Sequence, residues 1–299
     1  LTPCPPNPHP STSFFFLNPD HPTLDFRSHP RNHPRMRSDL HTHTPLCQHA
    51  EGSPAEMVAA ARAAGLDEIG FSDHNPMPTQ FDQWRMAPDE LPRYLAWIDE
   101  ARLAHPGFPI RIGLECDFIP GNEPHLRTLT ATHPWDYLIG SVHYIMDDWD
   151  VDSPFKRQRW NDQPVDQVWT AYFSRLEQAI DSQLFDFIGH FDLVKKFGDI
   201  PSGNLDRFYT GALDRLEAYG TALELNTAGW RKPVNEPYPS PAILREACRR
   251  GIPVLVNSDA HSPSEVAADF DRAYRILHEA GYRSVVRFHQ REPIPVPLS

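Results

Sequence analysis

The chain has 299 residues, of which 40% are hydrophobic, so it is long enough to bury one large core or two medium ones. Its formal net charge of −12 argues against broad electrostatic binding to nucleic acid or to an anionic membrane, because such binding relies on clustered cations. No apolar run approaches the ~20 residues of a membrane helix, and the four cysteines have no paired spacing, so we expect a cytoplasmic protein without a disulfide framework.

Residues 1–35 differ in composition from the rest of the chain. They contain nine prolines and four histidines, with no periodic apolar pattern that could supply a core. We therefore predict a disordered N-terminal extension over residues 1–35 and a single folded domain over residues 36–299. Met36 lies directly before the first patterned segment, and we expect translation to begin there naturally.

After Met36 a unit recurs, in which a capped helix ends at a glycine and a short apolar strand follows. The first such helix begins at the capping box Ser53-Pro54-Ala55-Glu56. Apolar residues run together in the strands instead of alternating, which indicates a parallel sheet whose outer side is covered by helices. Helices of this kind are predicted at residues 53–65, 240–251 and 262–281.

Seven predicted strands end on a residue that can bind a metal or hydrogen-bond a ligand: RSDLH, DEIGFSDH, IRIGLECD, YLIGSVHY, FDFIGHFD, ALELNTAG and PVLVNSDAH. In a closed (β/α) barrel all the strand C-termini open on one face, so these residues would converge. One strand-end histidine would usually be structural, but six are not plausibly coincidences. The convergent set is His41, His43, Asp73, His74, Glu115, His143, His190, Asn226, Asp259 and His261.

These strand-end motifs resemble those of the PHP (polymerase and histidinol phosphatase) superfamily. The matching motifs are DLHTH at 39–43, SDH at 72–74, GLE at 113–115, SVH at 141–143, GH at 189–190 and SDAH at 258–261. Within the superfamily, HTHTPLC, DHNPMP, GSVHY, KKFG and NTAGWRKP are most similar to the monofunctional histidinol-phosphate phosphatases. The resemblance runs from about residue 37 to the C-terminus.

The resemblance implies an α/β fold, a distorted seven-stranded (β/α) barrel with three divalent metal ions at the strand C-termini. Clustered cations need anionic ligands to screen their repulsion, and a carboxylate such as Glu115 can bridge two of them. Such ligands suit zinc, iron or manganese, and the sequence leaves that choice open. The ligands carried over are His41, His43, His74, Glu115, His143, His190, Asp259 and His261.

A metal-bridging hydroxide would be the nucleophile in such a site, so no side-chain nucleophile is required. Asp39 and Asp73 precede ligand histidines, and we expect them to accept hydrogen bonds that fix an imidazole tautomer; plain strand-end hydrogen bonding is the alternative. His49 is a candidate to contact phosphate or to protonate the leaving alkoxide, with a solvated loop histidine as the alternative. Cys47 and Cys116 are interpreted as packing or outer-shell residues.

Substrate recognition needs cations for the phosphate and acidic or aromatic groups for an amino-imidazole end. Residues 144–164 form a long segment rich in acids and aromatics, and we interpret it as a lid that meets the substrate's ammonium group. Each candidate cation could instead be an ordinary surface residue. The candidate phosphate contacts are Arg85, Lys195, Lys196, Arg231 and Lys232.

The predicted function is metal-dependent hydrolysis of L-histidinol phosphate in histidine biosynthesis, with a small-molecule substrate and neither nucleic acid nor membrane as a partner. A nuclease or nucleotide phosphoesterase of the same superfamily is the first alternative, although the net acidity disfavours a polynucleotide substrate. An inactive metal-binding scaffold is the second alternative. The complete ligand set argues against it, because lost catalysis usually leaves gaps in such a cluster.

Overall fold

The computed structural model describes residues 36–79, 82–146 and 149–298. The predicted N-terminal extension, residues 1–35, lies outside the described residues, so the boundary at Met36 stays a prediction.

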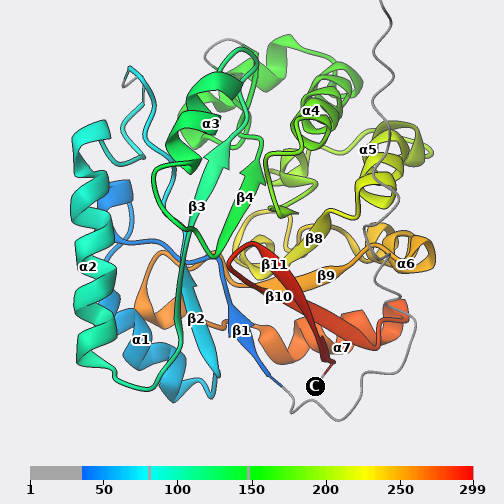
Figure 1. Cartoon of the computed structure of the whole chain (residues 1–299). Helices are drawn as coiled ribbons and strands as arrows, with labels where there is room; N and C mark the ends of the chain where they lie inside the picture. Colours follow the sequence, from blue (N-terminus) through cyan, green and yellow to red (C-terminus); the bar gives the residue numbers. More distant parts are fainter. Residues whose placement is uncertain (1–35, 80–81, 147–148, 299) are drawn as a thin grey trace, which may run out of the picture.

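A seven-stranded parallel sheet forms the centre of the molecule, with its strands in chain order (Figure 1). Its first and last strands approach each other, because Thr42 and Ala260 form a parallel bridge and His43 N donates to Ala260 O at 2.9 Å. The sheet is thus nearly closed into a barrel, which confirms the predicted fold and strand count. The strands are β1 (Ser38–Asp39), β2 (Glu68–Phe71), β3 (Ile110–Asp117), β4 (Tyr137–Ser141), β7 (Phe187–Ile188), β8 (Ala222–Asn226) and β9 (Val254–Asn257).

Seven α-helices in the described part of the chain surround the sheet (Figure 1). The capping box at Ser53 is present, since its side chain accepts from Glu56 N while the Glu56 carboxylate accepts from Ser53 N. Gly251 ends its helix in the left-handed conformation at φ 76°, as predicted from its position. The helices are α1 (Pro54–Ala63), α2 (Leu91–Ala104), α3 (Glu123–Thr130), α4 (Val165–Asp181), α5 (Asp206–Tyr219), α6 (Pro241–Arg250) and α7 (Phe270–Ala280).

The helix predicted at 262–281 begins later than expected. Only a short 3₁₀ helix, Pro263–Glu265, follows Ser262, and α7 starts at Phe270. Ala267 and Asp269 have positive φ values of 57° and 60°, which no helix accommodates. Glu265 accepts a hydrogen bond from His261 N at 2.8 Å instead of completing a capping box. The chain is therefore bent here to hold the loop after β9.

A C-terminal hairpin of β10 (Ser284–His289) and β11 (Glu292–Pro297) closes one end of the barrel (Figure 1). Val286 and Phe288 of β10 join a buried cluster with Tyr137, Phe187 and Ala222, which stand at the starts of their strands. The hairpin therefore packs at the N-terminal end of the barrel and leaves the C-terminal end open for a site.

Strand β11 carries Pro293, Pro295 and Pro297 at alternate positions. Leu298 N donates to Arg283 O at 3.0 Å, so the even-numbered residues of this segment direct their N–H groups toward β10. The prolines thus occupy the positions whose N–H would point away from β10, where a missing donor breaks no hydrogen bond of the hairpin.

Removing residues 1–35 is expected to leave the melting temperature, metal content and turnover of the protein unchanged, because this segment lacks a core-forming pattern. A chain that begins at Met36 can be compared with the full chain by thermal unfolding and phosphate release. A clear loss of either property would show that the extension packs on the barrel.

Candidate active site

The eight predicted metal ligands meet at the C-terminal end of the barrel, around the carboxylate of Glu115 at the end of β3. Its two oxygens lie 2.9 Å from His190 Nε2, 2.9 Å from His74 Nδ1 and 3.2 Å from His41 Nε2. His43 Nε2 and His143 Nε2 follow at 3.5 and 3.7 Å. Five imidazoles from four different strand ends thus surround one buried carboxylate.

Asp259 forms a second anionic centre beside the first. Its Oδ1 lies 3.3 Å from His43 Nε2, 3.6 Å from His41 Nε2 and 3.6 Å from His261 Nδ1. Asp259 has a positive φ of 53°, a strained conformation for a residue other than glycine that points to a constrained loop. His41 Nε2 and His43 Nε2 therefore each lie near two carboxylates, so an ion bound by these imidazoles would also be close to an anionic ligand.

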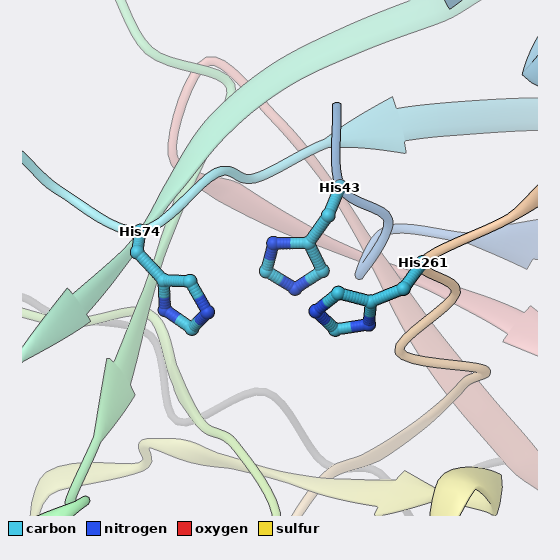
Figure 2. A group of neighbouring side chains, drawn as sticks. All are labelled: His43, His74 and His261. Carbon is cyan, nitrogen blue, oxygen red and sulfur yellow. The ribbon is translucent and has the colours of Figure 1, made fainter. Parts of the chain in front are cut away.

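The donor atoms fit divalent metals. Sets of three ligand atoms lie within 4.8 Å of one another, and Figure 2 shows one such set, His43, His74 and His261, directed toward a common space. Several buried ligand atoms make no hydrogen bond of normal geometry within the described ranges. Such atoms destabilise the folded protein unless another group, such as a metal ion, satisfies them. These atoms include His41 Nε2, His43 Nε2, His74 Nδ1, Glu115 Oε2 and His261 Nε2.

The imidazoles of the cluster differ in their pKa values. Burial lowers the pKa of His43 and of His74, so both imidazoles favour the neutral form that can coordinate a metal. Burial disfavours ionisation of Glu115, but the charges of His74 and His41 outweigh it and hold the pKa of Glu115 well below its usual range. At two other imidazoles burial is outweighed by the neighbouring carboxylates, which raise the pKa of His41 above its usual range and the pKa of His143 to about 10, so a bound divalent cation would displace protons from these two imidazoles.

A cavity of about 400 Å³ opens above this cluster. Its lining includes six of the eight predicted ligands, all but His41 and His43, and also His49, Lys196, Lys232 and residues of the segment that begins at Asp150. That volume is in the range of small-molecule sites.

The segment 144–164, predicted as a lid, contains regular structure. It begins with an antiparallel hairpin of β5 (Tyr144–Met146) and β6 (Trp149–Asp150), and it continues into the 3₁₀ helix Pro154–Asp162. Asp150, Asp152 and Phe155 of this segment line the cavity. The segment therefore forms a wall of the site, which agrees with the predicted covering position.

Comparison with known proteins identifies the family. The model of the PHP domain family matches residues 39–228. The chain belongs to the PHP domain family. This confirms the resemblance inferred from the strand-end motifs.

Individual PHP relatives cover most of the chain. It is 42% identical over 255 residues to a probable histidinol-phosphatase of Deinococcus radiodurans, a match that covers 85% of this chain and 97% of that relative. It is 28% identical to the histidinol-phosphatase of Bacillus subtilis, over 79% of this chain and 97% of that protein. A crystal structure of histidinol phosphate phosphatase from Lactococcus lactis, complexed with zinc, L-histidinol and phosphate, has a TM-score of 0.73 at 20% identity, and the match covers 86% of this chain and 98% of that one.

Two buried carboxylates of this PHP site were not predicted from the sequence. Glu224, inside β8, lies 2.8 Å from His41 Nδ1 and accepts from His190 N at 2.7 Å. Asp117 Oδ1 lies 2.6 Å from His143 Nδ1. Each carboxylate favours the tautomer that leaves Nε2 free for a metal. Asp117 could have been found by strand periodicity, because it follows Glu115 by two positions on the same face of β3.

Asp39 and Asp73 do not hold imidazoles as predicted. Asp39 is fully buried and accepts from Ser258 N at 3.0 Å and from Ala267 N at 3.1 Å. Asp73 accepts from Thr44 N at 2.6 Å, while its distance to His43 Nδ1 is 3.9 Å. The alternative, strand-end hydrogen bonding, describes both residues. Burial raises the pKa of Asp39 to about 6 and that of Asp73 to about 7.

Arg85 and Lys195, predicted phosphate contacts, are buried in ion pairs and are not among the described residues that line the cavity. Arg85 Nη2 donates to Asp117 Oδ2 at 2.9 Å, so it supports the carboxylate that orients His143. Lys195 Nζ lies 2.9 Å from Asp192 Oδ2 and donates to Pro237 O at 2.9 Å. Their predicted role is therefore corrected to support of the surrounding loops.

The other three predicted cations lie nearer the substrate space. Lys232 is exposed, and Lys196 is paired with Asp152 Oδ2 at 2.8 Å; both line the cavity. Arg231 donates to Ser258 O at 2.8 Å and lies 3.3 Å from Glu265, which places it behind the cavity lining. His49 Nδ1 lies 2.7 Å from Cys47 O, an arrangement in which Nδ1 donates and Nε2 stays available to a ligand.

Proposed function

We propose that this protein hydrolyses L-histidinol phosphate to L-histidinol and phosphate with bound divalent metal. The observation that carries the proposal is the cluster of imidazoles around Glu115 at the floor of a small-molecule cavity. The relatives named as histidinol-phosphatases, which match almost over their whole length, support this substrate and confirm the predicted assignment.

The metal number and identity are part of the proposal. We propose three ions, held by His41, His43, His74, Glu115, His143, His190, Asp259 and His261. The sets of mutually close donors and the two anionic centres support more than one ion, and the zinc bound in the Lactococcus lactis structure supports zinc over iron or manganese. When bound, such ions would lower the pKa of a water and draw charge from phosphate oxygens.

The residues of this chain would then orient the substrate above the metal ligands. Lys232 and Lys196 supply positive charge for the phosphate at the cavity wall. His49 is placed to contact the phosphate or the leaving oxygen through Nε2. The wall that starts at Asp150 bounds a space suited to a small monoester. A nucleic-acid chain continues on both sides of its phosphate and would need room beyond this wall.

The decisive experiment is phosphate release from a panel of monoesters and a dinucleotide diester, with metal content measured on the same sample. We expect a high kcat/KM for histidinol phosphate and scarcely any turnover of the diester. A diester that proves the better substrate would support the nuclease alternative. Full metal occupancy without turnover of any ester would support the inactive scaffold.

Replacing Lys232 with alanine is expected to lower kcat/KM for histidinol phosphate by roughly tenfold to a hundredfold, the loss of a charge-assisted hydrogen bond of about 1.5 to 3 kcal/mol. The metal content should stay normal, because Lys232 contacts no proposed ligand. Arg249→Ala, an exposed cation on α6, serves as the matched control. Unchanged kinetics of Lys232→Ala would remove Lys232 from the phosphate site.

A reducing, cytoplasmic setting is also part of the proposal. Cys47, Cys116 and Cys248 are free thiols, and burial raises the pKa of all three above the usual range, which leaves them unreactive. None of the helices in the described part of the chain combines the length and apolar content needed to cross a bilayer.

A further inference from the structure

The cavity contains one ion pair that the proposed hydrolysis does not by itself require. Asp152, which follows β6, meets Lys196, which follows β7, with 2.8 Å between Oδ2 and Nζ. Both side chains line the cavity, and they are only 22% and 17% exposed. A charged pair placed against the substrate space is positioned to interact with a bound ligand.

The state of Asp152 is that of a fixed anion. Burial opposes its ionisation, but Lys196 and His143 outweigh burial and hold its pKa well below the usual range. The negative charge is therefore present throughout the neutral pH range, and it is compensated in the free protein by Lys196. If Lys196 turned toward a bound phosphate, Asp152 would remain as a largely buried carboxylate without its cation, which is costly.

We propose that Asp152 selects phosphomonoesters whose alcohol part carries a positive charge, by exchanging Lys196 for the cation of the substrate. This inference rests on the proposed function and deepens it. A zwitterionic ester gives Lys196 a phosphate and gives Asp152 a cation, so both charges of the original pair keep a partner. When an ester with a neutral alcohol part binds, its phosphate pairs with Lys196 and Asp152 is left without a cation. The unpaired carboxylate therefore weakens the binding of such an ester.

The surroundings of Asp152 suit a cationic or imidazole group. Asp150 lies two residues earlier in the chain and also lines the cavity, where its carboxylate is paired with Lys156 at 3.0 Å, so Asp152 is the carboxylate of this wall that loses its cation if Lys196 turns away. Phe155 lies at the rim with 94% of its surface exposed, so its ring is available to stack on an imidazole or to face an ammonium group. The acidic wall therefore complements the tail of the substrate, and the metal ligands complement its phosphate.

The test compares kcat/KM for L-histidinol phosphate with kcat/KM for p-nitrophenyl phosphate, whose alcohol part is neutral, on metal-loaded full-length protein. Asp152→Asn should lower the ratio of the two values at least tenfold, mainly through KM for histidinol phosphate. Lys196→Gln should lower both values but raise their ratio, because Asp152 then has no partner in the free protein. Asp152→Glu should restore part of the parent ratio.

The matched control is Asp199→Asn, which removes a carboxylate paired with Arg157 of the same wall at 2.6 Å but outside the cavity lining. It should keep the parent ratio. Equal losses on both substrates in Asp152→Asn would overturn the inference, since Asp152 would then only orient Lys196. A parent protein that hydrolyses p-nitrophenyl phosphate but not histidinol phosphate would overturn the proposed function instead, so the two failures are distinguishable.

Discussion

Replacing Glu115 with glutamine is expected to remove most of the bound metal and to lower turnover by more than about a hundredfold, because it deletes the charge that would screen the proposed metal ions from one another. Five imidazole nitrogens lie within 3.7 Å of this carboxylate, so no other side chain of the described cluster contacts as many proposed ligands. Metal content and phosphate release, measured on the same purified sample, check the expectation.

The barrel itself should still fold in this variant, because the strand hydrogen bonds and the apolar core do not depend on Glu115. Circular dichroism would verify the fold. Glu246→Gln is the matched control, since Glu246 pairs with Arg249 and Arg250 on α6, away from the site. Full metal occupancy with near-normal turnover in Glu115→Gln would contradict a multi-metal site bridged by this residue.

Glu224→Gln is expected to weaken metal binding tenfold to a hundredfold, a typical loss for a residue that orients a ligand. The Glu224 carboxylate faces four donors, since its oxygens lie 2.8 Å from His41 Nδ1 and 2.7 Å from His190 N and also accept from Asn226 and Asn257. A glutamine amide would direct its own N–H groups at some of them. The free energy of unfolding of the variant should therefore also fall, by about 1 to 3 kcal/mol for each donor left unsatisfied, and its melting temperature should fall with it.

A metal-binding isotherm and a thermal melt separate these two effects. Glu68→Gln provides the control, because Glu68 is a buried carboxylate at the start of β2 that pairs with Arg111 and Arg287, at the opposite end of the barrel. It should lower the melting temperature without changing metal affinity. Normal metal affinity in Glu224→Gln would mean that His41 keeps its orientation without this hydrogen bond.

The sequence was sufficient to predict the barrel and the convergence of imidazoles and carboxylates at its C-terminal end, because each of these residues stands at a strand end and the sheet geometry brings such ends together. Glu224 was not predicted because it lies inside a strand. The role of an acidic residue within an apolar run depends on its partner across the barrel, and the local sequence does not identify that partner. Arg85 was assigned to phosphate because it lies in a family-like run after a strand, and such a run does not distinguish a solvent-facing cation from one buried against Asp117. Such errors concern long-range partners, which local pattern does not encode.

The start of α7 was mispredicted for a different reason. Residues 262–265 have the spacing of a capping box, but Glu265 is engaged by His261 N and the chain turns at Ala267 and Asp269. The helix signal of residues 262–265 is therefore not realised, because these tertiary contacts fix the loop after β9. That loop places Asp259 and His261 beside the other proposed ligands.

The alternate prolines of β11 have a consequence for how the protein behaves at high concentration. A two-stranded ribbon at the end of a barrel normally presents an outer edge whose free N–H and C=O groups can pair with a strand of another molecule. With Pro293, Pro295 and Pro297 in the outward positions, three successive donors of that edge are missing, and an incoming strand would find acceptors only. The hairpin can therefore seal the barrel with a β-structure that resists edge-to-edge self-association, so a single element both completes the core and protects the protein from aggregation.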